Sequence, residues 1–499
     1  MSLHSIERLI PNTATRPVWR RAGIRALESR LQADVASPLM DLAGLATARL
    51  ALAIAPHARR MLVLAGPGNN GGDGLEAAMH LHRWGKTVQV NLLAAPEQLP
   101  ADARRAFERA SQAGVPILTA PPEAGLDMGA QDLCIDALLG IGATRAPKGP
   151  LLQTIDWLNR SAACVLAVDI PTGLDADSGQ PLGSLDSVVH ADHTLTFLGA
   201  KPGLFMGHGR DACGSVWLAS LGLPAAAVQW APPDAALNPP AQAVHRRHAS
   251  HKGSHGDVAI VGGESHAQHG NSMAGAAVLA ANAALHGGAG RVMLTLLGPQ
   301  TPTLAPDVMR RDLQTLDLPQ LTVVAGCGGG QAIAEPLGRL LQHSARLVLD
   351  ADALNRLAED PWLQTLLTQR AQKKQATVLT PHPLEAARLL GCSTAQVQAD
   401  RLKAASDLAQ RWSCCVVLKG SGTVISAPHH TPHINATGNG LLATGGTGDV
   451  LAGLIGARLA TTGDAWRAVC DAVWLHGQVA DDWPGNQALT ASRLAESLR

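Results

Sequence analysis

Net charge, paired cysteines and a long apolar run are all missing from this sequence. Lys plus Arg and Asp plus Glu both number 40, so no basic field draws the protein to nucleic acid or to an anionic membrane. The eight cysteines include no C-x-x-C pair, which is typical of a reduced intracellular protein rather than a disulfide or zinc framework. No stretch has the length and apolarity of a signal peptide or membrane span. We therefore expect a cytoplasmic protein with no nucleic-acid and no membrane partner.

The 499 residues are too many for one hydrophobic core, and two or three domains are expected. In both halves, short apolar strands alternate with helical segments, a pattern that predicts parallel sheets covered by helices. An Ala/Pro-rich stretch, 224–244, separates the halves and is expected to be a linker. The predicted fold class is therefore α/β with two domains, 1–223 and 245–499. The strands are expected within 61–66, 87–94, 132–140, 164–173, 257–263, 291–298, 321–330, 346–355, 376–385 and 415–426, and helices within 25–54 and 75–85.

The first candidate site is the run GPGNNGGDG (66–74), between a predicted strand and a predicted helix. Its first six residues fit the G-x-G-x-x-G pattern of dinucleotide-binding folds. A dehydrogenase of that kind places an acidic residue at the end of the next strand, whereas here that strand ends in LLAAP. Side-chain oxygens of Asn69, Asn70 and Asp73 add polar groups to this loop. The plain alternative is a glycine-rich turn capped by Asn or Asp.

Three further polar segments follow predicted strands of the N-terminal half, and parallel strands bring such segments to one edge of the sheet. They are Asp136, the run GIGATRA (140–146), and Asp169 with Thr172. Their oxygens could surround a hard cation or fix ligand hydroxyls, and Arg145 with the glycine N–H groups suits phosphate. Asp136 as a strand-end cap and Asp169 as turn chemistry before a proline are the plain alternatives.

The most specific string of the chain is NGLLATGGTGDVLAG (439–453). A glycine-rich turn followed by a helix of small residues points backbone N–H groups and the positive helix end at an anion. Asp449, at the start of that helix, would lie beside bound phosphates and take the proton from a hydroxyl that attacks the terminal phosphoryl group. A capping role for Asp449 would not need the surrounding glycines.

Other loops of the C-terminal half carry supporting groups. The segment LKGSGTVI (418–425) suits nucleotide phosphate and ribose. His382, in TPHPLEAARLL (380–390), is either a substrate contact or only a turn residue. The strand-end acids of VLDADALN (348–355) either hold Mg²⁺ or cap the next helix. The residues in question are Lys419, Ser421, Thr423, His382, Glu385, Asp350, Asp352 and Asn355.

Together, GPGNNGGDG, DALLGIGATR and VDIPTGLDADSG resemble the NAD(P)H-hydrate epimerase domain, the YjeF N-terminal family, over residues 25–220. The resemblance implies a Rossmann-like domain, with Asn70, Asp136 and Thr172 binding a potassium ion. It also implies a substrate site for the hydrated nicotinamide nucleotide, in which Asp169 is our hypothesis for the base or ring-opening group. That site comprises Asn69, Asn70, Gly71, Gly72, Asp73, Gly140, Ile141, Gly142, Ala143, Thr144, Arg145, Ala146 and Asp169.

Residues 245–499 resemble the ribokinase-like superfamily, and more narrowly the NAD(P)H-hydrate dehydratase domain. HKGSHGDVAIVGG, VLDADALN, LTPHPLEAARLL, VLKGSGTVI and ATGGTGDVLAG occur in order. Two departures concern substrate contacts: His269 lies where an aromatic is common, and Cys327 where an aliphatic residue is usual. The resemblance implies an Mg²⁺ ion, a hydrate site of Ala276, Gly328, His382 and Asp449, and an adenine-nucleotide site of Lys419, Gly420, Ser421, Gly422, Thr423 and Gly448.

The two resemblances combine into one expected activity, repair of hydrated NADH and NADPH. The N-terminal domain would interconvert the R and S hydrates. In the C-terminal domain, Asp449 would deprotonate the hydroxyl of the S form, which would take the terminal phosphoryl group of the nucleotide. Elimination of phosphate would then yield NAD(P)H, with AMP as the other product. The likeness to bacterial fused proteins favours ADP over ATP as the donor. A homo-oligomer acting on small-molecule substrates is expected.

Two other interpretations remain. One is a ribokinase-like kinase of a small molecule such as a vitamin precursor, fused to a nucleotide-binding domain. The other is a nucleotide-sensing or RNA-associated module, suggested by HRRHASHKGSH (245–255), although the absence of net charge opposes an RNA partner. The histidines of that run, His245, His248, His251 and His255, also raise the question of zinc, which the loop setting makes unfavourable.

Overall fold

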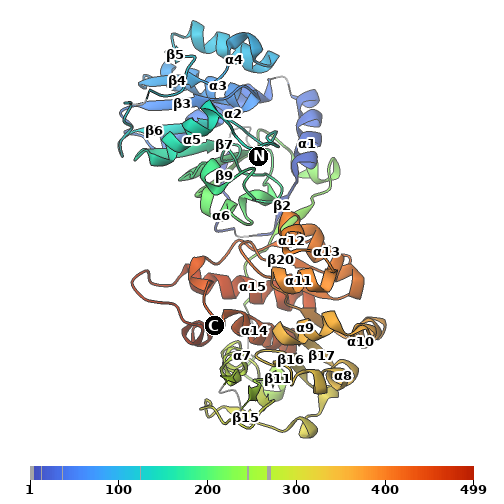
Figure 1. The fold of residues 1–499 in the computed structure, drawn as a ribbon. Coiled ribbons are helices and arrows are strands. Elements are labelled where there is room, and N and C mark those ends of the chain that lie inside the picture. The colour runs from blue at the N-terminus through green and yellow to red at the C-terminus, as the bar shows by residue number, and fades with distance from the viewer. Residues whose placement is uncertain are drawn as a thin grey trace. The chain divides into compact units, whose positions relative to one another are not determined.

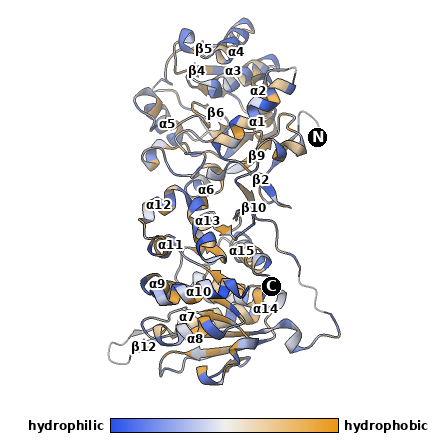
Figure 2. Cartoon of the chain, turned by 90° about the vertical axis from the view of Figure 1, so that its right-hand side faces the viewer, coloured by the Kyte–Doolittle hydropathy of each residue, from blue (hydrophilic) through white to orange (hydrophobic). Residues whose placement is uncertain are grey.

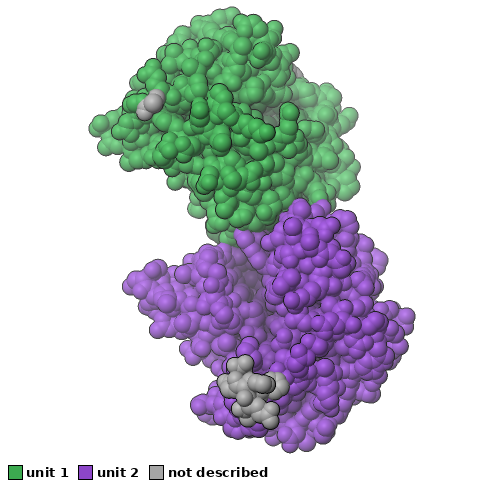
Figure 3. All heavy atoms as spheres, in the orientation of Figure 1, with its two compact units in different colours: residues 1–12, 16–236 green, residues 13–15, 237–499 purple. Residues whose placement is uncertain are grey.

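The computed structural model describes residues 5–12, 14–35, 37–123, 125–243, 247–266 and 271–498. The chain divides into two compact units between Ala236 and Leu237 (Figure 3). Each unit contains a largely parallel sheet with helices (Figure 1), which confirms the expected α/β class with two domains. Among the described residues, no single helix is long and apolar enough to cross a membrane. The pair Arg21–Asp34 and Leu39–Ile54, bent by 107°, meets those criteria of length and composition only when taken together.

The sheet of unit 1 has eight strands in the order β1-β9-β8-β7-β6-β3-β4-β5. All neighbours pair in parallel except β1 and β9. From β3 the chain proceeds to β4 on one side and later to β6 on the other, so the order reverses between β3 and β6. The strands are β1 (Ile6–Arg8), β3 (Met61–Ala65), β4 (Val88–Leu92), β5 (Ile117–Leu118), β6 (Leu133–Ala137), β7 (Cys164–Val168), β8 (His193–Phe197) and β9 (Ser215–Ala219).

Among the described residues six α-helices belong to unit 1, and apolar residues of five of them join the buried strands in the hydrophobic core. The helical pattern of residues 25–54 forms two helices rather than one. The break lies just before Pro38, as expected because a proline disfavours helical backbone in the residue before it. The helices are α1 (Arg21–Asp34), α2 (Leu39–Ile54), α3 (Asn69–Arg83), α4 (Ala101–Gln112), α5 (Pro150–Arg160) and α6 (Gly209–Ala212).

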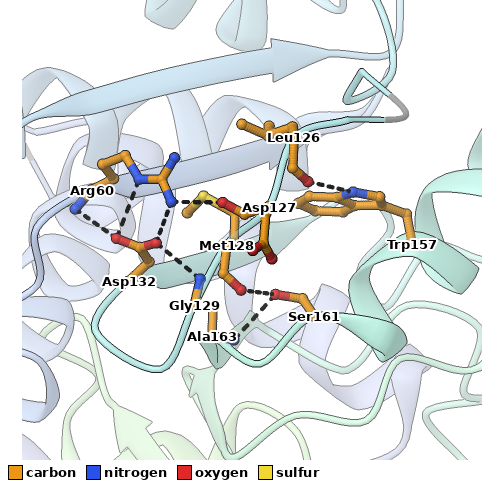
Figure 4. Close-up of polar contacts among 9 residues, drawn as sticks. All are labelled: Arg60, Leu126, Asp127, Met128, Gly129, Asp132, Trp157, Ser161 and Ala163. Carbon is orange, nitrogen blue, oxygen red and sulfur yellow. Dashed lines mark hydrogen bonds and ion pairs between the residues drawn. The ribbon is translucent and has the colours of Figure 1, made fainter.

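A polar cluster joins the amino ends of β3 and β6 (Figure 4). Arg60 faces Asp132. Its Nη2 atom lies 2.6 Å from the Asp132 carboxylate and also 2.6 Å from the Asp127 carbonyl oxygen. The N–H of Gly129 donates to the same carboxylate at 3.0 Å. The ion pair and its hydrogen bonds lower the pKa of Asp132. This cluster fixes the loop that enters β6, at the opposite edge of the sheet from the carboxyl ends of the strands.

The sheet of unit 2 runs in the order β15-β14-β11-β16-β17-β18-β19-β20-β21. It is parallel from β15 to β19 and antiparallel from β19 to β21, and its order reverses between β11 and β16. The segment 415–426, expected as one strand, is a hairpin of β19 and β20. The strands are β11 (Asp257–Gly262), β14 (Arg291–Leu296), β15 (Val308–Arg310), β16 (Thr322–Ala325), β17 (Arg346–Leu349), β18 (Thr377–Leu379), β19 (Cys415–Leu418), β20 (Val424–Ser426) and β21 (His433–Ile434), with β12 (Ser265–His266) and β13 (Asn271–Ser272) in a separate ribbon.

Two helices of small residues, α7 and α14, pack against each other closely in unit 2, where hydrophobic residues concentrate (Figure 2). A Cβ on Gly453 would collide with the Ala280 carbonyl group of α7, so glycine permits the contact. This packing fixes α14 and thereby its amino end. The helices are α7 (Ala274–His286), α8 (Ala334–His343), α9 (Ala351–Glu359), α10 (Pro361–Gln372), α11 (Pro383–Leu390), α12 (Thr394–Ala399), α13 (Arg401–Trp412), α14 (Thr447–Thr462), α15 (Ala465–Asp481) and α16 (Ala491–Glu496).

The stretch expected as a linker, 224–244, carries regular secondary structure between residues 225 and 237. A 3-10 helix covers Ala225–Gln229 and strand β10 covers Ala235–Leu237, whose residues are buried. The small size of alanine lets this segment pack although it shows no periodic pattern. A further short strand, β2 (Arg16–Val18), precedes α1.

Candidate active sites

The polar residues after β3, β6 and β7 meet at the reversal point of the unit 1 sheet, where ligands of open α/β sheets bind. Helix α3 begins at Asn69, six residues before the helix predicted from the sequence. The run 69–73 therefore forms the first turns of that helix and not a loop. Glycines allow this start, because a Cβ on Gly71 would collide with the Gly66 carbonyl group and one on Gly72 with Met40.

A cavity of about 1100 Å³ opens at this edge. It brings together most of the residues that the sequence assigned to the hydrate site. Gly71 and Gly72 are the exceptions, since they face the packed interior. The predicted residues that line the cavity are Asn69, Asn70, Asp73, Gly140, Ile141, Gly142, Ala143, Thr144, Arg145, Ala146 and Asp169, and Glu28 of α1 joins them.

Asp169 occupies a strained position on the cavity wall. Its φ of 69° is in the left-handed region, which side-chain-bearing residues adopt rarely and which is found often at functional sites. The Lys201 Nζ atom lies 2.8 Å from one carboxylate oxygen, and the Ile141 N–H donates to the other at 3.0 Å. Lys201 is fully buried and also donates to the Thr196 hydroxyl at 2.6 Å. Its charge therefore fixes the Asp169 carboxylate toward the cavity.

Two further carboxyl groups of the cavity, those of Asp73 and Glu28, have raised pKa values. Burial, followed by the charges of Asp169 and Glu28, raises the pKa of Asp73 well above its usual value. Burial and the Asp169 charge also raise the pKa of Glu28. A carboxyl group with a raised pKa keeps its proton to a higher pH and can donate it to a substrate, as a general acid must.

Of the three residues assigned to potassium, Asn70 lines the cavity, and Asp136 and Thr172 are hydrogen-bonded to each other. Asp136 accepts hydrogen bonds from the Thr172 hydroxyl at 2.7 Å and the Thr172 N–H at 2.8 Å. Burial raises the pKa of Asp136 to about 6, although these hydrogen bonds oppose the shift. Neither the oxygen nor the nitrogen of the buried Asn70 amide has a hydrogen-bond partner. An unpaired buried amide oxygen and a buried carboxylate are both oxygen ligands that suit a hard monovalent cation.

In unit 2, the carboxyl ends of β16 to β19 form a second site beside α14. Asp449 lies in the first turn of that helix, after Gly446 at a φ of 92°. Its carboxylate lies near the carboxylate of Asp350 and the thiol of Cys327. One ligand atom from each of these three residues lies within 4.8 Å of the other two. Burial and then the Asp350 charge raise the pKa of Asp449 to about 6, while a hydrogen bond from the Cys327 thiol opposes this. The carboxylate is therefore a stronger base than a free aspartate and still ionised at neutral pH.

Lys419 connects the nucleotide loop to this cluster. Its Nζ atom lies 2.6 Å from the Asp350 carboxylate, which also accepts from the Thr380 hydroxyl at 2.8 Å. Burial alone would lower the pKa of Lys419, but the charges of Asp350 and Glu385 outweigh it and raise the pKa. A Cβ on Gly448 would lie 3.4 Å from Nζ, so the lysine reaches the turn that precedes Asp449.

His382, Ala276 and Gly328 are the other residues that the sequence assigned to the hydrate. His382 is the N-cap of α11, because its Nδ1 atom accepts from the N–H groups of Leu384 and Glu385 at 3.1 and 3.4 Å. Ala276 and Gly328 face each other, since a Cβ on Gly328 would lie 3.0 Å from that of Ala276. Burial and the Lys419 charge lower the pKa of His382, so a neutral imidazole is available at neutral pH.

Two of the residues expected as magnesium ligands or caps, Asp352 and Asn355, are hydrogen-bonded elsewhere. Asp352 accepts from the Gly330 N–H at 2.8 Å, and Asn355 accepts from Arg388 at 2.6 Å. Asp350 is the acid of this strand end that faces Asp449. Among the residues the structure describes, the only group of three metal-binding side chains is the Cys327 cluster, and the histidines of 247–255 form none. His245 and His269 lie outside the described residues.

Two functional candidates escaped the sequence reading. Lys201 is one, because nothing local distinguishes a lysine that becomes fully buried against an aspartate 32 positions earlier. Arg401 is the other, buried beneath the loop from Lys419 to Thr423. All eight cysteines, each within the described residues, are unpaired, in agreement with the absence of a disulfide framework.

Comparison with known proteins identifies relatives over nearly the whole chain. A family model described as YjeF-related protein N-terminus matches residues 36–203, and one described as NAD(P)H-hydrate dehydratase matches 258–499. The bifunctional NAD(P)H-hydrate repair enzyme of Escherichia coli (strain K12) is 39% identical over 506 residues, covering 95% of this chain and 90% of that protein. The enzyme of the same description from Coxiella burnetii is 35% identical, covering 92% and 94%. A Bacillus subtilis ADP/ATP-dependent NAD(P)H-hydrate dehydratase, solved with ATP/Mg²⁺, is 29% identical with a TM-score of 0.42 over 51% of this chain and 91% of that one.

Proposed function

This chain belongs to the family of bifunctional NAD(P)H-hydrate repair enzymes, and on that premise we propose that it repairs hydrated NADH and NADPH with one site in each unit. Unit 1 epimerises the R and S hydrates, and unit 2 dehydrates the S hydrate in a nucleotide-dependent reaction. The observation that carries the proposal is the presence of two separate reactive centres, each at the carboxyl ends of the parallel strands of its own sheet. One is built around Asp169 and the other around Asp449.

In unit 2, Asp449 acts as the general base. The ring hydroxyl of the S hydrate gives its proton to the Asp449 carboxylate, and the oxygen attacks the terminal phosphorus of ADP, releasing AMP. Phosphate then leaves together with a proton from the neighbouring ring carbon, which restores the double bond of the dihydronicotinamide. The raised pKa of Asp449 suits this task, because the carboxylate is ionised at neutral pH yet accepts a proton more readily than an ordinary aspartate.

The donor groups around Asp449 also suit Mg²⁺ bound with the nucleotide. Asp350 and Asp449 offer two carboxylates, and Mg²⁺ is usually bound by one or two carboxylates together with substrate phosphates. The ion would neutralise charge on those phosphates. Lys419 supplies a positive charge at the same place, held by Asp350. The nucleotide is assigned to Lys419, Gly420, Ser421, Gly422, Thr423 and Gly448, and the hydrate to Ala276, Gly328, His382 and Asp449.

In unit 1, Asp169 is the proposed base of the epimerisation. The carbon to be inverted carries both a hydroxyl and the ring nitrogen, so removal of the hydroxyl proton opens the ring and reclosure gives either epimer. Lys201 holds the Asp169 carboxylate in place, and Asp73 can supply a proton because its pKa is raised. A potassium ion held by Asn70, Asp136 and Thr172 would provide fixed positive charge for the substrate.

The test is incubation of the chain with mixed hydrate epimers and either ADP or ATP. Recovery of absorbance by the reduced ring, with equal amounts of free phosphate and of AMP from ADP, is the expected result. The alternative function, phosphorylation of a small molecule such as a vitamin precursor, would leave a stable phosphorylated product and no recovery of reduced nucleotide. Product analysis by chromatography separates the two directly.

A further inference from the structure

Arg401, the first residue of α13, points its guanidinium group at the underside of the loop from Lys419 to Thr423. Its Nη2 atom lies 3.2 Å from the carbonyl oxygen of Leu418, 3.2 Å from that of Lys419 and 3.4 Å from that of Gly422. The Nη1 atom donates to the Gln398 side chain at 2.8 Å. One side chain thus donates hydrogen bonds to carbonyl groups on both sides of the hairpin turn between β19 and β20.

The direction of these carbonyl groups determines the direction of the adjacent N–H groups. In a trans peptide the C=O of one residue and the N–H of the next point in opposite directions. With the Lys419 and Gly422 carbonyls turned toward Arg401, the N–H groups of Gly420 and Thr423 point to the other face of the loop. Gly420 is exposed and Thr423 half-buried, so that face is open to a ligand. Outward N–H groups are what an anionic nucleotide requires.

Arg401 itself is only 2% exposed, and no carboxylate in the described part of the chain pairs with it. Burial lowers its pKa to about 10, which leaves it charged at neutral pH. A buried cation without a counter-ion is unfavourable for folding unless its hydrogen bonds and a function compensate.

The loop backbone is fitted to this guanidinium. Gly420 has a φ of 132°, and a Cβ there would lie 3.0 and 3.2 Å from the two terminal nitrogens of Arg401. Any larger residue would therefore press on the guanidinium in a backbone conformation that only glycine adopts readily.

We propose that Arg401 is the positioning residue of the nucleotide site: it turns the carbonyl groups of the Lys419–Thr423 loop inward so that the N–H groups face the phosphates of ADP or ATP. The inference rests on the assignment of this loop to the nucleotide under the proposed function. Arg401 acts through the loop and does not touch the reacting atoms.

Arg370 provides a matched control for the effect on folding. It is also buried, 1% exposed and without a carboxylate partner among the described residues, and it donates to the carbonyls of Leu341 and Ser344 at 3.0 and 2.7 Å. Burial lowers the pKa of Arg370 to about 10 as well. Arg370 lies in α10 and contacts none of the proposed nucleotide residues.

The experiment measures ADP and ATP binding to the full chain by calorimetry without hydrate, in the wild type and in R401M, R401K and R370M. R401M is expected to raise the Kd for ADP at least about tenfold, the scale of losing one or two hydrogen bonds to a charged group. The KM for ADP should rise in parallel, with kcat at saturating ADP little changed. R401K, which keeps the charge but cannot bridge the carbonyls, should fall between. R370M should leave the Kd unchanged, and epimerase activity should survive in all three.

An unchanged Kd in folded R401M, or an equal rise in R370M, would overturn the proposal, as would a wild-type chain that does not bind ADP. If R401M fails to fold, R401K and G420A decide by the same criteria. Because binding is measured without hydrate, a chain that binds ADP through this loop yet dehydrates nothing contradicts the proposed function and leaves the role of Arg401 intact.

Discussion

Replacing Asp449 by Asn should abolish dehydration and at the same time stabilise unit 2. The change removes the base but keeps the shape of the side chain in the first turn of α14. Loss of a general base lowers the rate by about 10²- to 10⁴-fold. The effect on stability has the opposite sign, because burial and the Asp350 charge make the ionised form of Asp449 unfavourable in the folded state.

The size of the stabilisation follows from the two pKa values. The pKa of Asp449 is about 6 in the folded chain, against 3.8 for an unperturbed aspartate. Since one pKa unit corresponds to about 1.4 kcal/mol, ionised Asp449 costs about 3 kcal/mol of folding free energy above pH 6. A folded-state pKa raised above the unfolded value means that this cost is absent below about pH 4 and grows as the pH rises to 6. Loss of the favourable interaction of a carboxylate with the helix amino end reduces the expected gain by about 0.5 kcal/mol.

The assay is urea unfolding of both chains at pH 4, 5, 6, 7 and 8, following the unit 2 transition with EDTA present. D449N should be more stable than the wild type by about 2–3 kcal/mol at pH 7 and 8, with the difference vanishing near pH 4. Epimerase activity serves as the control for the integrity of unit 1. A variant less stable than the wild type at pH 8, or a difference independent of pH, would refute the reasoning, and so would normal dehydration.

Three further changes address unit 1. Asp169→Asn should lower the epimerisation rate at least about 100-fold with nucleotide-dependent dehydration intact, and full epimerase activity in that variant would remove Asp169 from the mechanism. Thr172→Val should weaken the activation of epimerisation by KCl relative to NaCl, and an unaltered KCl dependence would count against the potassium site. Asp132→Asn should destabilise unit 1 at neutral pH, because Arg60 lowers the pKa of that carboxyl; the deficit should shrink as the pH falls below about 4, and urea unfolding that shows a pH-independent deficit would contradict this.

The sequence predicted the parts of the fold that depend on local pattern. Buried strands such as β3 and β11 are apolar runs that end at glycine, and each expected strand segment contains an observed strand. Strands such as β8 and β9 lie outside every expected segment. The turn before Asp449 was recognisable because left-handed backbone at Gly446 and close packing at Gly453 both demand glycine. These are requirements of the chain itself and need no distant partner.

What escaped the sequence reading depends on contacts between distant segments. Lys201 and Arg401 look like ordinary surface residues until tertiary packing buries them against Asp169 and against the loop at Gly420. The start of α3 at Asn69 runs against the low helix propensity of glycine and is decided by the close approach to Gly66. The local sequence pattern therefore does not predict where elements begin and end, or which buried residues position a site.

The central claim is that one chain repairs both hydrate epimers through two separate sites. It is tested most directly by supplying the isolated R hydrate with ADP and following reduced-nucleotide absorbance in the wild type, in D169N, in D449N, and in an equimolar mixture of the two variants. The account predicts full recovery by the wild type, little by either variant alone, and restored recovery by the mixture, because the epimerised substrate leaves one chain and reacts on another. Rapid recovery from the R hydrate by D169N alone, or none by the wild type, would contradict the account.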